Sequence, residues 1–508
     1  MRWPLRLPRP SASRLANVPL LAAACGLVAG TTLALLAGQT SPLAAAAIMA
    51  GLVVAGAVML FPELGLLLTA FVIPLERVGR LTDDNAVQTL SLMRFVGMLA
   101  LGAFLLHALL KKWQLRFGGP ILLYGAYFAF GVLTVLFTSD REGGIRTAGQ
   151  VAGNLAFLFL VVNIVRSWRL AKLGAITWLA ASVLAGTWTI YNWHFSGGDR
   201  IVGEQHIGST SKRFKATMDD DSKWDKLEGA VQRAQGTTSH PAVHGINMVV
   251  TLPFWVYLFR VARSPWARGA AAASLAICLY NIFLTNTRAA ILLAAVVLAL
   301  TALRRLVEIT PGRLVAGLLL ATAGLYFVPE DVWTRVLDLT RYFSGQNTGT
   351  FGLRLQFWDA ALEGASRNPW LGHGMGNQTI VPALVEGASP TRISAHNEYL
   401  NMLLEVGIIG WVLMFGTVFL LVRSSFRAAW LFRTLPGHEE QYWFMVASQI
   451  ALISALLYGV QVDVFHFPLK PWWFVAGLAV ALELLAREEA ARAAAAAAPQ
   501  PDAPGRAA

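Results

Sequence analysis

The sequence predicts an all-α polytopic membrane protein with about twelve to fourteen transmembrane helices. Of its 508 residues, 56% are hydrophobic and only 14% are charged, whereas a soluble domain carries about 25% charged residues. Apolar runs of roughly 20 residues, the length that crosses a bilayer, recur from end to end of the chain. Lys and Arg gather in short clusters between these runs, a bias that is typical of membrane-protein loops.

The apolar runs give the candidate spans in chain order. They fall at about 16–37, 42–61, 63–78, 92–110, 119–137, 148–165, 170–192, 241–260, 268–284, 289–304, 313–328, 398–422, 441–460 and 470–486. The short pairs within 42–78 and 268–304 could each form a broken or re-entrant element, so the helix count stays open within that range.

Basic clusters orient the spans across the membrane. The N-terminal residues 1–15 are basic and precede an apolar run that is too long for a signal-peptide core, which predicts a retained first helix and a cytoplasmic N-terminus. Alternating the spans from there puts the C-terminus and every inter-span cluster on the cytoplasmic side. Those clusters are Lys111 to Arg116, Arg166 to Lys172, Arg260 to Arg268, Arg304-Arg305 and Arg423 to Arg427.

The same alternation leaves two long loops on the outer face, 194–240 and 329–395, and each is too long to be only a connector. Residues 353–362 of the second loop have the pattern of a short amphipathic helix suited to a membrane surface. The predicted organisation is a basic N-terminus (1–15), N-terminal spans (16–193), the first loop (194–240), central spans (241–328), the second loop (329–395), C-terminal spans (396–486) and a disordered cytoplasmic tail (487–508).

The net charge of +12 would suggest nucleic acid as the partner of a soluble protein. Here the charge belongs to inter-span clusters and to attraction by anionic lipid, so no nucleic-acid role is predicted. Cys25 and Cys278 both lie in apolar spans, which argues against a disulfide framework or a Cys-ligated metal.

Three polar residues are expected to meet at the outer face, each at the mouth of a different apolar span: Arg233, Arg288 and His396. Arginine suits a phosphate ligand, because its planar fork of donors binds phosphate oxygens in a bidentate way. Histidine is the usual side chain for accepting a proton near neutral pH. The trio therefore predicts a site that binds phosphate and moves a proton.

Simpler interpretations exist for each of these residues. Arginines at membrane boundaries often extend to lipid headgroups, and an interfacial histidine can be only a cap. Gly372-His-Gly-Met-Gly376 follows no strand, so a turn is favoured over a phosphate-binding loop. His240, His244 and His373 show no helical ligand spacing with His396, and no metal site or cofactor is predicted.

Four short motifs in order resemble the O-antigen ligase and polymerase superfamily. They are Arg233-Ala-Gln-Gly-Thr-Thr-Ser-His-Pro, Asn286-Thr-Arg288-Ala-Ala, Arg354-x-x-x-Trp358 followed by Asn368-Pro-Trp-Leu-Gly-His-Gly374, and His396-Asn-Glu-Tyr-Leu with Glu405-Val-Gly407. The resemblance covers roughly residues 230–410, and outside that range only the hydropathy agrees.

The resemblance implies a glycosyltransferase of the bacterial inner membrane with a periplasmic site. Such an enzyme moves a glycan from undecaprenyl diphosphate to an acceptor hydroxyl, without metal or nucleotide and with inversion. By the same resemblance, Arg233 and Arg288 would hold the donor diphosphate, and His396 would act as the base on the acceptor hydroxyl or support the leaving phosphate. The residues expected to contact substrate are Arg354, Trp358, Asn397, Tyr399 and His240.

Several functions within and outside the family remain open. A ligase would use lipid A–core as acceptor, a polymerase another carrier-linked repeat unit, and a third group protein hydroxyls. The basic outer loops favour the anionic lipid A–core, in a protein that acts as a monomer among membrane lipids. A transporter or flippase of lipid-linked glycans is the alternative from another class, but the few mid-bilayer charges and the lack of a repeat disfavour it.

Overall fold

The computed structural model describes residues 42–75, 78, 91–195, 233–238, 240–308, 310–312, 315, 322, 349–377, 380–384, 394–462 and 469–497. Within these ranges the secondary structure is helical, and no strand occurs there. The predicted span 16–37, the span 313–328 except residues 315 and 322, most of the first long loop and residues 329–348 of the second lie outside the described residues. The helix count of twelve to fourteen therefore stays a prediction, whereas the all-α polytopic class is confirmed.

The helices follow the apolar runs closely. Their bounds are α3 Pro42–Leu60, α4 Pro62–Val72, α5 Leu92–Leu110, α6 Gly119–Val135, α7 Arg141–Ile164, α8 Trp168–Phe195, α11 Pro241–Val261, α12 Pro265–Leu284, α13 Arg288–Leu303, α16 Gly349–Arg367, α17 Ile380–Leu384, α18 Glu398–Thr434, α19 Glu439–Tyr458 and α20 Lys470–Ala497. Polar caps fix several of the starts; for example, Asp140 accepts from Gly143 N at 3.0 Å and begins α7 seven residues before the predicted span.

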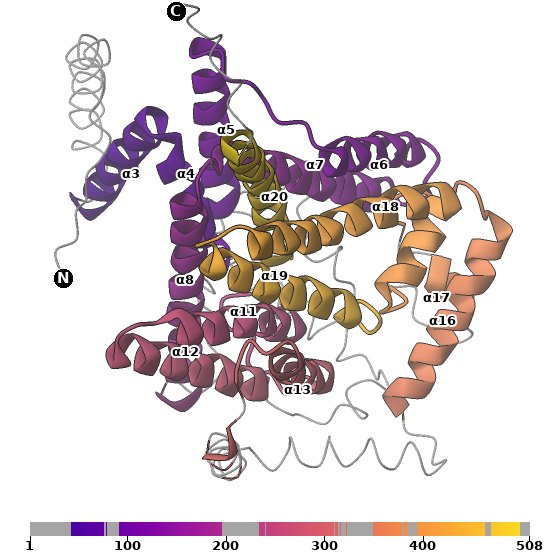
Figure 1. Ribbon diagram of the computed structural model, residues 1–508. Helices are drawn as coiled ribbons and strands as arrows, with labels where there is room; N and C mark the ends of the chain where they lie inside the picture. The colour runs from indigo at the N-terminus through magenta and orange to yellow at the C-terminus, as the bar shows by residue number, and fades with distance from the viewer. Residues whose placement is uncertain are drawn as a thin grey trace, which may run out of the picture.

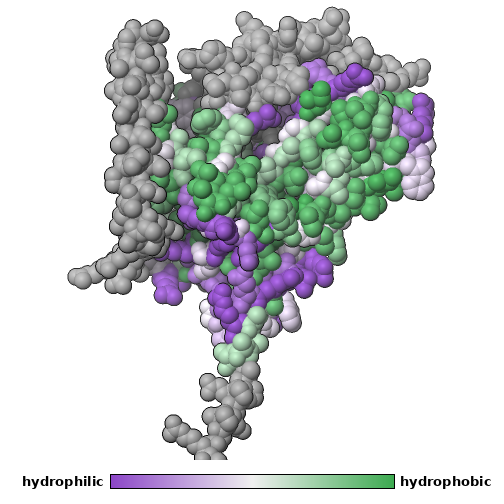
Figure 2. Space-filling model, turned by 90° about the horizontal axis from the view of Figure 1, so that it is seen from above, coloured by the Kyte–Doolittle hydropathy of each residue, from purple (hydrophilic) through white to green (hydrophobic). Residues whose placement is uncertain are grey.

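Seven of the described helices are long and apolar enough to cross a membrane, namely α5, α7, α8, α11, α12, α18 and α19. Shorter apolar helices are α4, α6, α13 and the Ala50–Leu60 part of α3. Figure 2 shows the matching surface, a broad hydrophobic area with hydrophilic residues gathered at its lower edge and at its upper right. Such a hydrophobic area is what a lipid-facing surface requires.

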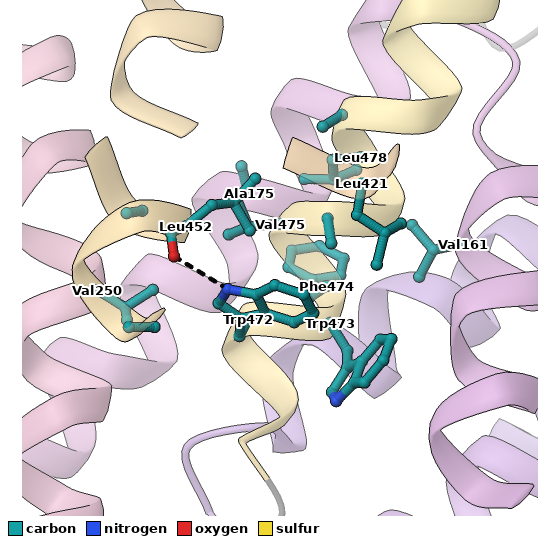
Figure 3. Packing of buried hydrophobic residues seen from close by; sticks show 14 of the residues in the cluster. Val161, Ala175, Val250, Leu421, Leu452, Trp472, Trp473, Phe474, Val475 and Leu478 are labelled. Atoms are coloured by element: carbon teal, nitrogen blue, oxygen red, sulfur yellow. Dashed lines mark hydrogen bonds between the residues drawn. The ribbon is translucent and has the colours of Figure 1, made fainter. Parts of the chain in front are cut away.

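The centre of the molecule is occupied by α20, which packs against α7, α8, α11, α18 and α19 (Figure 1). Trp472, Trp473 and Phe474 are fully buried there, and the Trp472 indole Nε1 donates to the Leu452 carbonyl at 3.1 Å (Figure 3). A buried indole needs such a partner, because an unpaired N–H in an apolar core is costly. The N-terminal half of α20 therefore lies in the core, whereas Glu483 and Arg487 bring charge to its second half.

Two helices extend further than the sequence predicts. The predicted span 398–422 continues to Thr434 as α18, and α20 runs to Ala497, past the expected start of the tail at 487. Alanine and arginine are both strong helix formers, so neither the cluster at Arg423 nor the Ala-rich stretch ends its helix. Residues 498–508 lie outside the described part of the chain.

The helix α16 confirms the amphipathic pattern of residues 353–362. Phe357, Ala360 and Ala361 are buried against Val381, Ala395 and Leu404, while Leu355 and Leu362 on the other face are exposed. Figure 1 shows α16 at one edge of the molecule, beside the N-terminal end of α18 and running across its direction. This helix therefore covers the end of the bundle at which α18 begins.

Candidate functional site

The long helix α18 is broken at Gly407, which has φ +60° and ψ −170°. A loop, residues 368–376, pairs with the break from outside the helix. Ile408 N donates to Pro369 O at 2.8 Å, and His373 N and Gly374 N donate to Leu404 O and Glu405 O at 2.9 and 2.8 Å. The loop thus replaces the hydrogen bonds that the helix loses, as an interrupted membrane helix requires.

The expected turn at Gly372-His-Gly-Met-Gly376 is confirmed, because all three glycines have positive φ. A Cβ on Gly372 would lie 2.5 Å from the Glu405 carbonyl, so only glycine permits this approach. The buried Glu405 carboxylate accepts from Gly376 N at 2.8 Å. His373 is tied to the Gly364 carbonyl by Nε2 at 2.8 Å, and its surroundings are those of a packing residue.

Arg233 lies against the turn between α12 and α13. Its Nε donates to Thr285 O at 3.2 Å and its Nη2 donates to the Thr287 hydroxyl at 3.0 Å. The backbone is paired as well, since Ala234 N donates to Leu284 O at 2.9 Å. Arg288 is the first residue of α13 and follows Thr287 directly, so the two predicted arginines come from neighbouring segments of the chain.

His396 precedes α18 in a strained conformation. Its φ is +50°, a left-handed value that is uncommon for a residue with a Cβ and that often marks functional positions. The Asn397 side chain caps α18 by accepting from Tyr399 N and Leu400 N at 3.1 and 3.3 Å, and Ala395 N donates to Asn401 Oδ1 at 2.9 Å. The residues on both sides of His396 are therefore fixed, and the imidazole is half-buried.

The C-terminal end of α19 joins these pieces. The Tyr458 hydroxyl donates to Ala242 O at 3.1 Å, which ties α19 to the start of α11 just after Arg233. Gly459 O accepts from Glu398 N at 2.9 Å, which ties it to the start of α18 just after His396. The start of α11 and the start of α18 thus meet around one helix end.

The surface helix α16 contributes to the same place. Both Arg233 and Arg354 lie close enough to interact electrostatically with the Tyr458 phenol. One turn further along α16, the Phe357 ring lies 6.5 Å from the His396 ring. The structure therefore brings the segments of Arg233, Arg354 and His396 to the end of α19, and Arg288 directly follows Thr287, to which Arg233 is bonded.

Four other predicted residues have structural contacts in this arrangement. His240 caps α11 by accepting from Ala242 N at 3.1 Å, and Asn397 caps α18. The Tyr399 hydroxyl donates to the Leu456 carbonyl. Trp358 packs on the apolar face of α16, and its buried indole N–H has no protein acceptor in the described residues. Contact of any of them with substrate remains a prediction.

The histidines weighed as metal ligands are separated by their contacts. The buried His244 bonds Asn281 Oδ1 at 3.0 Å, and its ring packs on Gly236. Across the described residues, no group of three or more His, Cys, Asp or Glu side chains could hold a metal ion.

Tyr458, Thr287 and Glu398 also belong to this region, although the sequence did not predict a role for them. Glu398 is completely buried although it is ionisable and begins a helix. Its position within His396-Asn-Glu-Tyr-Leu was the available signal, whereas Tyr458 stands at the end of an ordinary apolar run and carries none.

Comparison with known proteins supports the resemblance. Residues 273–415 match the family model described as O-Antigen ligase, a range that contains Arg288, Arg354 and His396 and leaves Arg233 outside. No curated protein matches the chain. The matched domain supports membership of the O-antigen ligase and polymerase superfamily.

Proposed function

We propose that this protein is an O-antigen ligase, which transfers a glycan from undecaprenyl diphosphate to a sugar hydroxyl of lipid A–core at the periplasmic face of the inner membrane. The superfamily is one of glycosyl-transfer enzymes. The observation that carries the proposal is the end of α19, where Tyr458 and Gly459 hold the segments of Arg233 and His396 together.

The two arginines would hold the donor diphosphate. The Thr285 carbonyl and Thr287 hydroxyl orient the Arg233 guanidinium beside the first residue of α13, Arg288. A fixed fork of donors binds phosphate oxygens strongly and costs little reorganisation when charge develops on the leaving group. The same α13 N-terminus adds the positive end of a helix dipole, which favours an anion.

The reaction is a single displacement. The acceptor hydroxyl oxygen forms a bond to the anomeric carbon while the bond from that carbon to the diphosphate oxygen breaks. The hydroxyl proton passes to the His396 imidazole, and the electron pair leaves with the diphosphate held by the arginines. Attack from the side opposite the diphosphate inverts the anomeric centre. A positioned base contributes about 10²- to 10⁴-fold to such a step.

The test uses the full chain purified in detergent with EDTA. An undecaprenyl-diphosphate glycan and a lipid A–core acceptor are supplied, and the products are separated on a gel. Glycan on the core supports the ligase. Longer glycan on the carrier would replace it by a polymerase, and glycan on a protein acceptor by a protein oligosaccharyltransferase.

A transporter is distinguished by a second measurement on the same preparation. The protein is reconstituted in vesicles that contain the lipid-linked glycan, and the fraction of glycan accessible to an added glycosidase is followed. Movement across the bilayer without any transfer would overturn the proposed enzyme.

A further inference from the structure

A pocket lined by two arginines lies at the end of the bundle away from His396. The helix α11 starts beside Arg233 and ends at Val261, and α13 starts at Arg288 and ends at Leu303. At 1.5 Å per residue, the 21 residues of α11 put its two ends about 30 Å apart. The C-terminal ends of both helices therefore lie roughly a bilayer core away from the proposed transfer site.

An open pocket of about 630 Å³ lies beside these helix ends, and its volume is within the usual size of ligand sites. Its wall consists of Arg260, Ala302, Arg305, Val307, Glu308 and Trp443. Two guanidinium groups face one carboxylate, so the pocket is net positive. Its remaining wall, from Ala302, Val307 and the Trp443 ring, is largely apolar.

Arg260 is held rigidly in this wall. Its guanidinium stacks on the Trp443 ring at 3.8 Å from the ring centroid. Its Nη1 donates to Arg305 O at 3.1 Å, and its Nη2 lies 3.7 Å from a Glu308 carboxylate oxygen. The stacking and the bonds to carbonyl groups fix the plane of the Arg260 guanidinium before any ligand binds. The loss of side-chain entropy on binding is therefore smaller.

Arg305 occupies a position that normally belongs to glycine. Leu306 N donates to Thr301 O and Arg305 N donates to Ala302 O, both at 2.9 Å, which is the paired pattern that closes a helix around a left-handed residue. Arg305 has φ +54°, and its side chain is exposed at the pocket. Glycine would close this helix without strain, so the turn itself gives no reason for an arginine here.

We propose that the pocket binds the phosphate of an anionic phospholipid headgroup in the leaflet opposite the transfer site. The two arginines suit a phosphate diester, because planar forks bind two oxygens each. Leu303, which is exposed on the last turn of α13, offers a surface for an acyl chain. The Glu308 carboxylate at the rim disfavours a second negative charge, so a monoanionic headgroup such as phosphatidylglycerol fits best.

The proposal is tested by native mass spectrometry of the full chain in detergent, titrated with phosphatidylglycerol or phosphatidylcholine. The wild-type protein should retain phosphatidylglycerol about tenfold more tightly, as for a charge-assisted contact. Arg305→Ala should remove most of this preference. The matched control is Arg263→Ala, an exposed arginine at the same end of the bundle but outside the pocket, which should keep it.

Equal losses in Arg305→Ala and Arg263→Ala would mean diffuse surface charge and would overturn the site. Arg260→Lys adds a second arm, since it keeps the charge but loses the planar fork, and full retention of the lipid preference would also count against the site. Thermal stabilisation by inorganic phosphate, absent in Arg305→Ala and unaccompanied by any lipid preference, would assign the pocket to a soluble phosphate and overturn the lipid.

Discussion

The two ends of the helix bundle are held together in different ways. At the end away from His396, charged side chains pair across helix termini: Arg116 with Glu488 at 2.8 Å, Arg427 with Glu483 at 3.4 Å, and Lys172 with Glu440. At the other end, backbone bonds join several of the segments directly. Loop 368–376 pairs with α18, residue 234 pairs with the end of α12, and Gly459 pairs with Glu398.

The charged side chains at the two ends thus have different roles: at one end they join helices, and at the other they belong to the proposed site. Partly exposed ion pairs tolerate movement and contribute only about 0–1 kcal/mol each. Buried backbone bonds have narrow geometry, and losing one costs more. A fold that fixes its loops by such bonds can hold an arginine and a histidine at set positions, which is what the proposed chemistry requires.

The largest expected effect on glycan transfer comes from comparing a histidine substitution at one end of the bundle with a histidine substitution at the other. His396→Ala should lower the rate of glycan transfer by at least about 100-fold, because the proposed base is removed. The matched variant is His438→Ala, whose imidazole contacts Glu489 at 2.6 Å at the opposite end. It should keep wild-type transfer in the same gel assay. If His396→Ala unfolds at a much lower temperature than the wild type, its loss of activity would reflect structure and not chemistry.

The next effect concerns an arginine at each end. Arg288→Ala should lower kcat/KM for the lipid-linked donor by about 100-fold, and Arg288→Lys should recover only part of it because bidentate geometry is lost. Arg268, which donates to Ala262 O at 3.0 Å at the opposite end, provides the control, and Arg268→Lys should leave donor kinetics unchanged. Full activity in Arg288→Lys would argue against the diphosphate role.

A smaller effect, on the free energy of unfolding, is expected from replacing a glycine at each end of the bundle. Gly407→Ala should lower the free energy of unfolding by at least about 2 kcal/mol, from the left-handed conformation and the overpacking together. Its new Cβ would meet the Trp370 backbone at 2.4 Å. Gly269, within α12, has open space around it, so Gly269→Ala should stabilise by up to about 1 kcal/mol. Thermal unfolding in detergent measures both, and equal midpoints would show that the break at Gly407 is not needed.

The smallest effect is expected from an ion pair. Glu440→Gln weakens the contacts of that carboxylate with Lys172 and with the Tyr257 hydroxyl, which donates to it at 3.1 Å. Because both charged side chains are about a third exposed, the loss should be below about 1 kcal/mol, and glycan transfer should not change. A large loss of transfer would show that the two ends are coupled.

Much of the fold could be predicted from hydropathy. The predicted spans 92–110 and 241–260 coincide with α5 and α11 almost to the residue, because polar caps and loops bound the apolar runs there. Helix ends within charged or Ala-rich stretches could not be predicted in this way. Arg423 and the residues after 487 are compatible with helix, so hydropathy ended α18 and α20 too early.

The convergence of Arg233, Arg288 and His396 was itself a prediction from the sequence, but the bonds that hold their segments together could not be predicted. Arg233, Arg288 and His396 stand at helix mouths, which the sequence reveals. Tyr458 and Gly459 join two of those mouths through their bonds with Ala242 and Glu398, which are far from each other in the chain, and nothing local marks a long-range bond. Arg233 and Thr287 are likewise separated in the chain by α11 and α12, so their pairing has no local signal.

The break at Gly407 is joined on both of its sides by one loop. The two turns from Glu398 to Val406 are bonded to the loop that follows α16, while the longer remainder of α18 crosses the bundle. The same loop also bonds the helix beyond the break, where Ile408 N donates to Pro369 O at 2.8 Å. A change in the length of this loop would therefore disturb both parts of α18 at once.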